Sequence, residues 1–134
     1  MVTNSLTLAT ILSKKDIKTY CTGGEIFETS LAHFGSFAEE FIKKFNFDKM
    51  FFSCYGISDK GMLTDPSLPE TQVRRIAMEQ SREVFFLCDE SKFSLSAPYN
   101  LAPIQSLSCV ITNTEAVYNY FNDEDREKAI ILSD

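Results

Sequence analysis

The sequence has few of the residues and motifs by which an enzyme or a metalloprotein is usually recognised. It contains no tryptophan and one histidine, His33, which has no second ligand-type residue at metal-binding spacing. It also has no P-loop, no GxGxxG fingerprint and no Ser/His/Asp series. These absences argue against a histidine-based metal site, a P-loop nucleotide site and a serine hydrolase, and no cofactor is expected.

Cysteine pairs, long apolar runs and a leader segment are missing too. The four cysteines are Cys21, Cys54, Cys88 and Cys109; none forms a CxxC pair, and three lie in apolar runs. We therefore expect buried free thiols in a reducing cytosol. No apolar run approaches the ~20 residues of a membrane helix, and no basic region followed by an apolar block marks a signal peptide. A cytoplasmic location without a membrane partner is the resulting expectation.

Basic residues are outnumbered by acidic ones. The chain has 13 Lys and Arg against 19 Asp and Glu, a net charge of −6. Because an acidic domain is repelled by the phosphates of nucleic acid, DNA contact by this chain alone is not expected. With 134 residues, 44% of them hydrophobic, the chain has the size and composition of one globular domain.

Short apolar runs alternate with segments of helical spacing along the chain. Strands are predicted at Ile17–Cys21, Asp48–Cys54, Val84–Cys88, Leu107–Thr112 and Ala129–Leu132. Helices are predicted at Leu6–Leu12, Ser36–Phe45, Leu68–Gln80 and Glu115–Phe121. This alternation predicts βαβ units, and therefore an α/β fold with a mostly parallel sheet flanked by helices.

Two of the predicted helices carry more detailed expectations. Ser36 and Glu39 have the spacing of a capping box. Phe37, Phe41 and Phe45, with Ala38 and Ile42 beside them, recur at helical spacing and predict one apolar face of that helix. In the helix from Leu68 to Gln80, Arg74 and Arg75 are expected on a solvated face, with phosphate binding as the alternative.

The run Val84–Cys88 is read as the central strand, buried on both faces. It ends abruptly at polar residues, which places them at the carboxyl edge of a parallel sheet, where open α/β folds bind ligands. Asp89 and Ser91 are suited to hydroxyl groups, and Lys92 to a phosphate or a polarised carbonyl oxygen. Structural roles are the alternative: Asp89 could cap the next turn, and Lys92 could simply be solvated.

Four further residues are predicted to line the same ligand site. Asn4, Gly23, Gly24 and Gly56 each follow a predicted strand, and backbone N–H groups beside the glycines would bind an anion. For the glycines, ordinary turns are an equally good interpretation.

Several motifs occur in an order that points to one protein family. They are VTNS at Val2–Ser5, TGGE at Thr22–Glu25, a helix opening at Gly35, DKMFFSCYGIS at Asp48–Ser58 with Gly61, a helix beginning at Glu70, and DESKF at Asp89–Phe93. Over nearly the whole chain, this series resembles the carboxyl-terminal effector domain of the DeoR family of bacterial transcriptional repressors.

The resemblance implies a fold similar to ribose 5-phosphate isomerase and glucosamine-6-phosphate deaminase. It also implies the sensing of a phosphorylated sugar and the relay of its presence to a DNA-binding module. DNA would then be contacted only through a helix-turn-helix domain that this chain does not contain, and a homo-oligomer is expected.

The chain departs from the family pattern at three points. The winged helix-turn-helix and the first sensor strand, which ends in D-x-G-T-T, have no counterpart here, and Asn113 stands where the family usually has Asp. We therefore expect residues 1–134 to form a single sensor domain that is a fragment, missing the DNA-binding domain and the first βα unit.

Two other functions stay open at this point. An aldose–ketose isomerase would use Asp89 as base and Lys92 beside the developing enolate. A second acid/base pair and the isomerase's glycine-rich lysine motif are missing, so enzyme activity is not expected. The other is an oligomerisation module without ligand binding, favoured by exposed strand edges and apolar surface.

Overall fold

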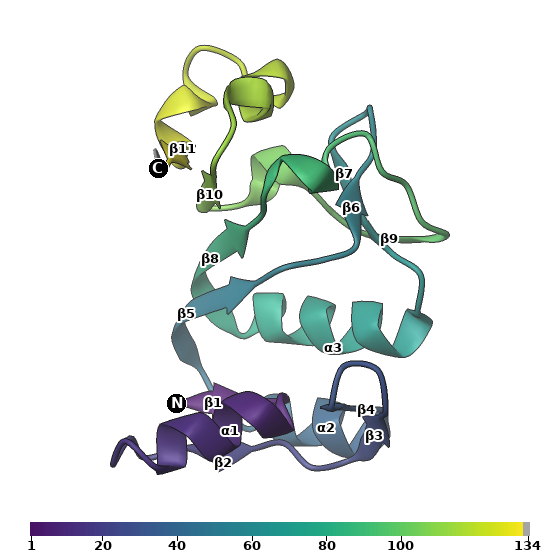
Figure 1. The fold of residues 1–134 in the computed structure, drawn as a ribbon, viewed down its shortest axis with the longest axis vertical. Coiled ribbons are helices and arrows are strands. Elements are labelled where there is room, and N and C mark those ends of the chain that lie inside the picture. Colours follow the sequence, from purple (N-terminus) through teal and green to yellow (C-terminus); the bar gives the residue numbers. More distant parts are fainter. Residues whose placement is uncertain (133–134) are drawn as a thin grey trace. The chain divides into compact units, whose positions relative to one another are not determined.

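The structure is a computed structural model and describes residues 1–132. The chain divides into two compact units, Met1–Phe45 and Asn46–Asp134, and each is described by itself (Figure 1). The expectation of a single domain over the whole chain stays a prediction.

The first unit contains two small pairs of strands and two helices. β1 (Val2–Thr3) pairs in parallel with β2 (Tyr20–Cys21), β3 (Glu25–Phe27) pairs antiparallel with β4 (Ala32–Phe34), and the helices are α1 (Leu6–Ser13) and α2 (Ser36–Ile42). The prediction of α1 is confirmed, since the Ser5 hydroxyl caps it by accepting from the Leu8 N–H at 3.2 Å. The predicted strand from Ile17 is shorter, because only Tyr20 and Cys21 pair.

The capping box predicted for α2 is wrong, and its predicted apolar face is confirmed only in part. Its cap is Gly35, at φ 87°, and no side chain caps it, so the chain turns directly from β4 into the helix and Ser36 is already helical. Phe37 is 80% exposed, whereas Ala38 and Ile42 are buried. The burial of Ala38 and Ile42 confirms part of the predicted apolar face, and Phe41 and Phe45 are half-buried, whereas Phe37 at its edge is exposed.

The second unit is built on a four-stranded parallel sheet in the order β11-β10-β8-β5 (Figure 1). Its strands are β5 (Phe47–Phe52), β8 (Ser81–Leu87), β10 (Cys109–Thr112) and β11 (Ala129–Ile131). The α/β fold with a parallel sheet flanked by helices is thus confirmed. α3 (Leu68–Glu79) precedes β8 and is capped by the Ser67 hydroxyl.

A smaller antiparallel sheet packs with the parallel one. It has the order β6-β7-β9, formed by β6 (Gly56–Ile57), β7 (Met62–Asp65) and β9 (Tyr99–Pro103). Four 3₁₀ helices complete the unit: η1 (Glu90–Lys92), η2 (Ile104–Ser106), η3 (Glu115–Tyr120) and η4 (Asp125–Lys128). The helix predicted after Thr114 is therefore a 3₁₀ helix.

The core of the second unit lies on one face of the parallel sheet. Phe52, Phe86 and Val110, from three neighbouring strands, pack there against Leu63 of the small sheet and Val117 of η3. α3 turns the buried Val73 inward, and Met78 packs against the same cluster.

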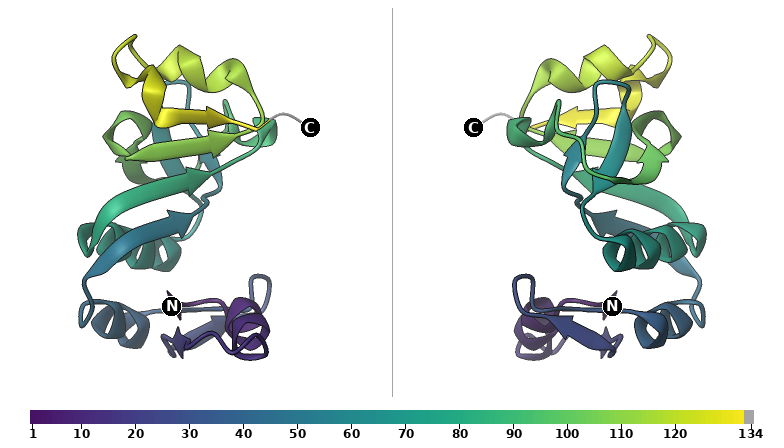
Figure 2. Two further views of the ribbon diagram at one scale, coloured as in Figure 1. Left: turned by 90° about the vertical axis from the view of Figure 1, so that its left-hand side faces the viewer. Right: turned by 90° about the vertical axis from the view of Figure 1, so that its right-hand side faces the viewer.

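The opposite face of the parallel sheet is open within residues 46–132, and Figure 2 (left) shows the strands in front of α3. Phe51 is 59% exposed, Leu87 41% and Ile130 46%. The prediction that the central strand is buried on both faces is therefore wrong. The strands follow one another in space as in sequence, so that right-handed crossovers place every connection on the same side of the sheet.

The four cysteines are free thiols; Cys54 and Cys109 are buried, whereas Cys21 and Cys88 are half-buried. Of the helices in residues 1–132, none combines the length and the apolar character that crossing a bilayer demands.

Candidate functional site

A hollow of about 410 Å³ lies at the carboxyl ends of the parallel strands in the second unit. This is the edge at which open α/β sheets bind ligands, and the volume falls in the usual range of small-molecule sites. Residues in or directly after all four strands of the sheet supply the wall. The lining residues are Ser53, Leu87, Cys88, Asp89, Lys92, Ile111, Thr112, Asn113 and Leu132.

Asp89 and Lys92 both line this hollow, as the polar end of the central strand predicts. Asp89 caps η1, with one carboxylate oxygen accepting from the Ser91 N–H at 2.9 Å and from the Ser91 hydroxyl. These two hydrogen bonds, aided by the charge of Lys92, hold the pKa of the exposed Asp89 carboxyl below its usual value. Like any exposed aspartate, Asp89 is ionised at neutral pH, and it can accept hydrogen bonds from hydroxyl groups.

Ser91 is not part of the lining, and its hydroxyl donates to Asp89. Its place in the site is therefore indirect: it orients the carboxylate and lowers the pKa of that group. A direct contact between Ser91 and a ligand stays a prediction.

The end of β10 supplies polar groups that the prediction did not include. The Asn113 side-chain oxygen accepts from the Glu90 N–H at 3.0 Å and so ties the end of β10 to η1. The buried Thr112 hydroxyl has no hydrogen-bond partner of good geometry among residues 1–132. Because buried polar groups are normally paired, an unpaired hydroxyl in the wall of a hollow is a candidate ligand contact. The direct succession of Thr112-Asn113 after an apolar strand could have identified both residues.

Cys88 is the least polar of the titratable groups in the wall. Burial raises the pKa of its thiol to about 11, although the neighbouring Thr112 hydroxyl acts in the opposite direction. Cys88 is therefore a neutral thiol at physiological pH and contributes shape rather than charge.

Gly56 lies in β6, away from the lining of the hollow. A Cβ atom added there would approach the Leu95 Cβ to 2.5 Å and the Leu95 carbonyl oxygen to 2.8 Å. Close packing against the loop after η1 is thus sufficient reason for a glycine at this position. A ligand contact by Gly56 stays a prediction.

Asn4, Gly23 and Gly24 belong to the first unit. Asn4 donates from its amide to the His33 carbonyl at 3.2 Å, and a Cβ atom on Gly24 would lie 2.6 Å from the Phe34 carbonyl oxygen. Gly23 and Gly24 have φ of 68° and 112°, a region that favours glycine. Each residue has a local structural role, and the ligand contacts expected of all three stay predictions.

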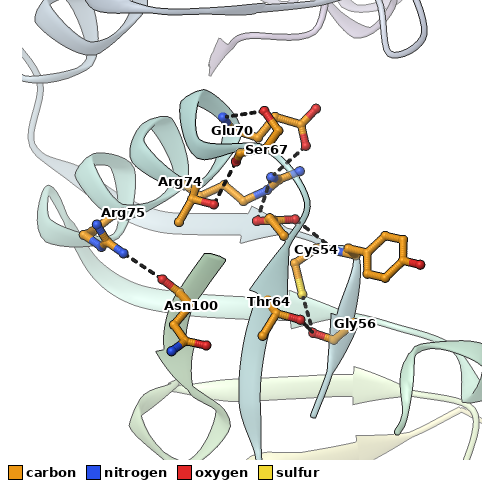
Figure 3. Close-up of polar contacts among 11 residues, drawn as sticks. Cys54, Gly56, Thr64, Ser67, Glu70, Arg74, Arg75 and Asn100 are labelled. Carbon is orange, nitrogen blue, oxygen red and sulfur yellow. Dashed lines mark hydrogen bonds and ion pairs between the residues drawn. The ribbon is translucent and has the colours of Figure 1, made fainter. Parts of the chain in front are cut away.

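Sequence reasoning missed a buried ion pair in the second unit, drawn in Figure 3. Asp65, 1% exposed, accepts from the Arg74 guanidinium at 2.9 Å and from the Tyr55 N–H at 3.0 Å. Arg74 also reaches Glu70 at 3.4 Å. The prediction that Arg74 faces solvent is therefore wrong, and the spacing of Glu70 and Arg74 on one helix face was the available signal. Arg75 is exposed and donates to the Asn100 carbonyl at 2.7 Å.

Comparison with known proteins identifies the family. The family model described as the DeoR C terminal sensor domain matches residues 1–114. The glycerol-3-phosphate regulon repressor of Escherichia coli is 31% identical, over 84% of this chain and 45% of its own length. The lactose phosphotransferase system repressor of Staphylococcus epidermidis is 30% identical, over 84% and 46%. The transcriptional repressor AccR of Agrobacterium fabrum is 29% identical, over 98% and 53%.

The chain spans about half the length of the curated relatives it matches, and the matches cover most of the chain. These relatives are named as repressors, which agrees with a regulatory role and not with the isomerase alternative. The resemblance seen in the sequence motifs is confirmed: the chain belongs to the DeoR family, as a sensor domain of its C-terminal type.

Proposed function

We propose that this domain senses a phosphorylated sugar or sugar derivative and reports its presence to a DNA-binding module. The ligand occupies the hollow at the carboxyl edge of the parallel sheet. Lys92 binds the phosphate, and Asp89 accepts hydrogen bonds from the sugar hydroxyls. The observation that carries the proposal is the presence of one ammonium group and one carboxylate group, from Lys92 and Asp89, in the wall of a hollow of suitable size.

The charges in the wall favour a ligand with two chemical parts. Within residues 1–132, Lys92 is the one cation and Asp89 the one anion that line the hollow. A bare anion would gain from Lys92 but would be repelled by Asp89, whereas a sugar phosphate satisfies both groups. The Asn113 amide and the Thr112 hydroxyl, which lies next to the Cys88 thiol, add neutral partners for further hydroxyl groups.

The names of two relatives support this class of ligand. One relative is called a glycerol-3-phosphate regulon repressor and another a lactose phosphotransferase system repressor. Both names refer to the metabolism of sugars or of a phosphorylated polyol, and we extend that class to the present chain.

A thermal-unfolding screen tests the proposal. Glucose 6-phosphate, ribose 5-phosphate and glycerol 3-phosphate represent phosphorylated hexoses, pentoses and triose derivatives. A ligand at 100 times its Kd adds about 2.7 kcal/mol of stability, which raises the midpoint of this domain by roughly 3–6 °C. The matched controls are the unphosphorylated sugars and inorganic phosphate, each of which satisfies only one of the two charged groups. The absence of a shift with every phosphorylated compound, or equal shifts with inorganic phosphate, would contradict the proposal.

A further inference from the structure

Strand β7 carries two adjacent buried polar residues that reach two different loops beside the hollow. Thr64 is 2% exposed and Asp65 is 1% exposed. Because consecutive side chains of a strand point to opposite faces, the two residues can bind different partners. Figure 3 shows Thr64 directed at Gly56, with Arg74 among the side chains grouped beside them.

Asp65 holds the loop that follows β5. One of its carboxylate oxygens accepts from the Tyr55 N–H at 3.0 Å, two positions after Ser53 in the wall of the hollow. The other oxygen accepts from Arg74 of α3 at 2.9 Å. The ion pair orients the carboxylate, so the backbone next to Ser53 is fixed to a rigid helix.

Thr64 holds the start of β6, directly after that loop, and also the loop that follows η1. Its hydroxyl donates to the Gly56 carbonyl at 3.4 Å and accepts from the Ala97 N–H at 3.0 Å. Ala97 lies five positions after Lys92. An isolated bridge between Ile57 and Phe93 links the same two segments.

We propose that Thr64 and Asp65 are positioning residues for the ligand site, and this inference rests on the proposed function. They touch neither the hollow nor any lining side chain in the hydrogen bonds described above. Instead they set the distance between the wall that contains Ser53 and the wall that contains Lys92. Binding groups on loops gain their precision from such buried supports, because the loops have little regular structure of their own.

Amide hydrogen exchange of three variants tests whether Thr64 holds both loops. Thr64→Val keeps the shape of the side chain and removes the hydroxyl, whereas Thr64→Ser keeps the hydroxyl. Thr71→Val is the matched control, because Thr71 is also fully buried but its hydroxyl donates to the Ser67 carbonyl within α3, at 2.9 Å. Amide hydrogen exchange is measured on the free protein.

Thr64→Val is expected to raise amide exchange about tenfold in residues 53–57 and 92–97 together. Thr64→Ser should restore protection in both segments, and Thr71→Val should leave them protected. In the wild type, the Tyr55 and Ala97 amides should exchange more slowly than the neighbouring Cys54 and Ser96 amides. The inference would be overturned if exchange in Thr64→Val were unchanged or if Thr71→Val raised it equally. It would also be overturned if the Tyr55 and Ala97 amides of the wild type exchanged fast.

The link to binding is tested with the three phosphorylated compounds of the screen. For any that binds the wild type, Kd should rise about tenfold in Thr64→Val and stay unchanged in Thr71→Val. An unchanged Kd in a variant with raised exchange would also overturn the inference. If the wild type binds none of them, the proposed function fails, whereas the exchange measurement still decides whether Thr64 holds both loops.

Discussion

At the scale of single residues, the sequence indicated the chemistry of Asp89 and Lys92 but not the groups around them. The type and order of these two residues after an apolar strand were enough to place them at the edge of the sheet. The support that Ser91 gives to Asp89 and the unpaired state of Thr112 depend on side-chain directions, which a sequence pattern does not contain. For Gly56, the sequence pattern predicted a ligand contact, whereas the structure gives a packing reason for the glycine. That reason is the close approach of Leu95, which is distant in sequence.

One prediction at this scale concerns Cys54 and alkaline pH. Burial, followed by the negative charge of Asp65, raises the pKa of this thiol to about 11. In the unfolded chain it would ionise near 8.5. The folded state then binds more protons than the unfolded state, so stability falls as pH rises between these two values. Between pH 7.5 and 9.5 the wild type should lose about 1 kcal/mol through Cys54.

Urea unfolding of the wild type and Cys54→Ala at both pH values measures this loss. Comparing the two proteins cancels the titration of all other groups, so the wild type should lose about 1 kcal/mol more than the variant. Equal losses in the two proteins would show that Cys54 does not contribute.

At the scale of elements, local signals located most helices and strands but not all of their ends. The helix α1 was predicted correctly from Ser5 and the apolar residues that follow it, because the capping residue and the helix are adjacent in sequence. The prediction that Ser36 caps α2 was wrong because Gly35, which directly follows strand β4, is the N-cap residue. The strand β7 was not predicted, because apolar and polar residues alternate only weakly over its four positions. These residues are buried because β7 lies between β6 and β9.

The second prediction belongs to the contact between β7 and α3. Arg74→Met should destabilise the domain by about 3 kcal/mol, because Asp65 would remain buried without its charge partner. The adjacent Arg75→Met is the control, since Arg75 is exposed and should cost less than about 1 kcal/mol. Chemical denaturation of both variants provides the values. A loss for Arg74→Met as small as that for Arg75→Met would mean that the ion pair is not needed for stability.

At the scale of the whole molecule, the alternation of apolar patterns was sufficient to predict an α/β fold with a parallel sheet. It did not predict the open face of that sheet, because the order of the strands decides on which side the connections lie. The exposed Phe51 and Ile130 on this face are the features that bear on self-association, which stays a prediction. Membership of the DeoR sensor family was recognisable from motifs spread over both units.

The central claim is that the ammonium group of Lys92 holds the phosphate of a sugar ligand. It is tested most directly by repeating the thermal-unfolding measurement on Lys92→Ala with the compound that stabilises the wild type. The matched control is Lys60→Ala, since Lys60 is an exposed lysine that does not line the hollow. We expect the shift in midpoint to disappear in Lys92→Ala and to remain in Lys60→Ala. A shift of wild-type size in Lys92→Ala would show that Lys92 does not hold the phosphate.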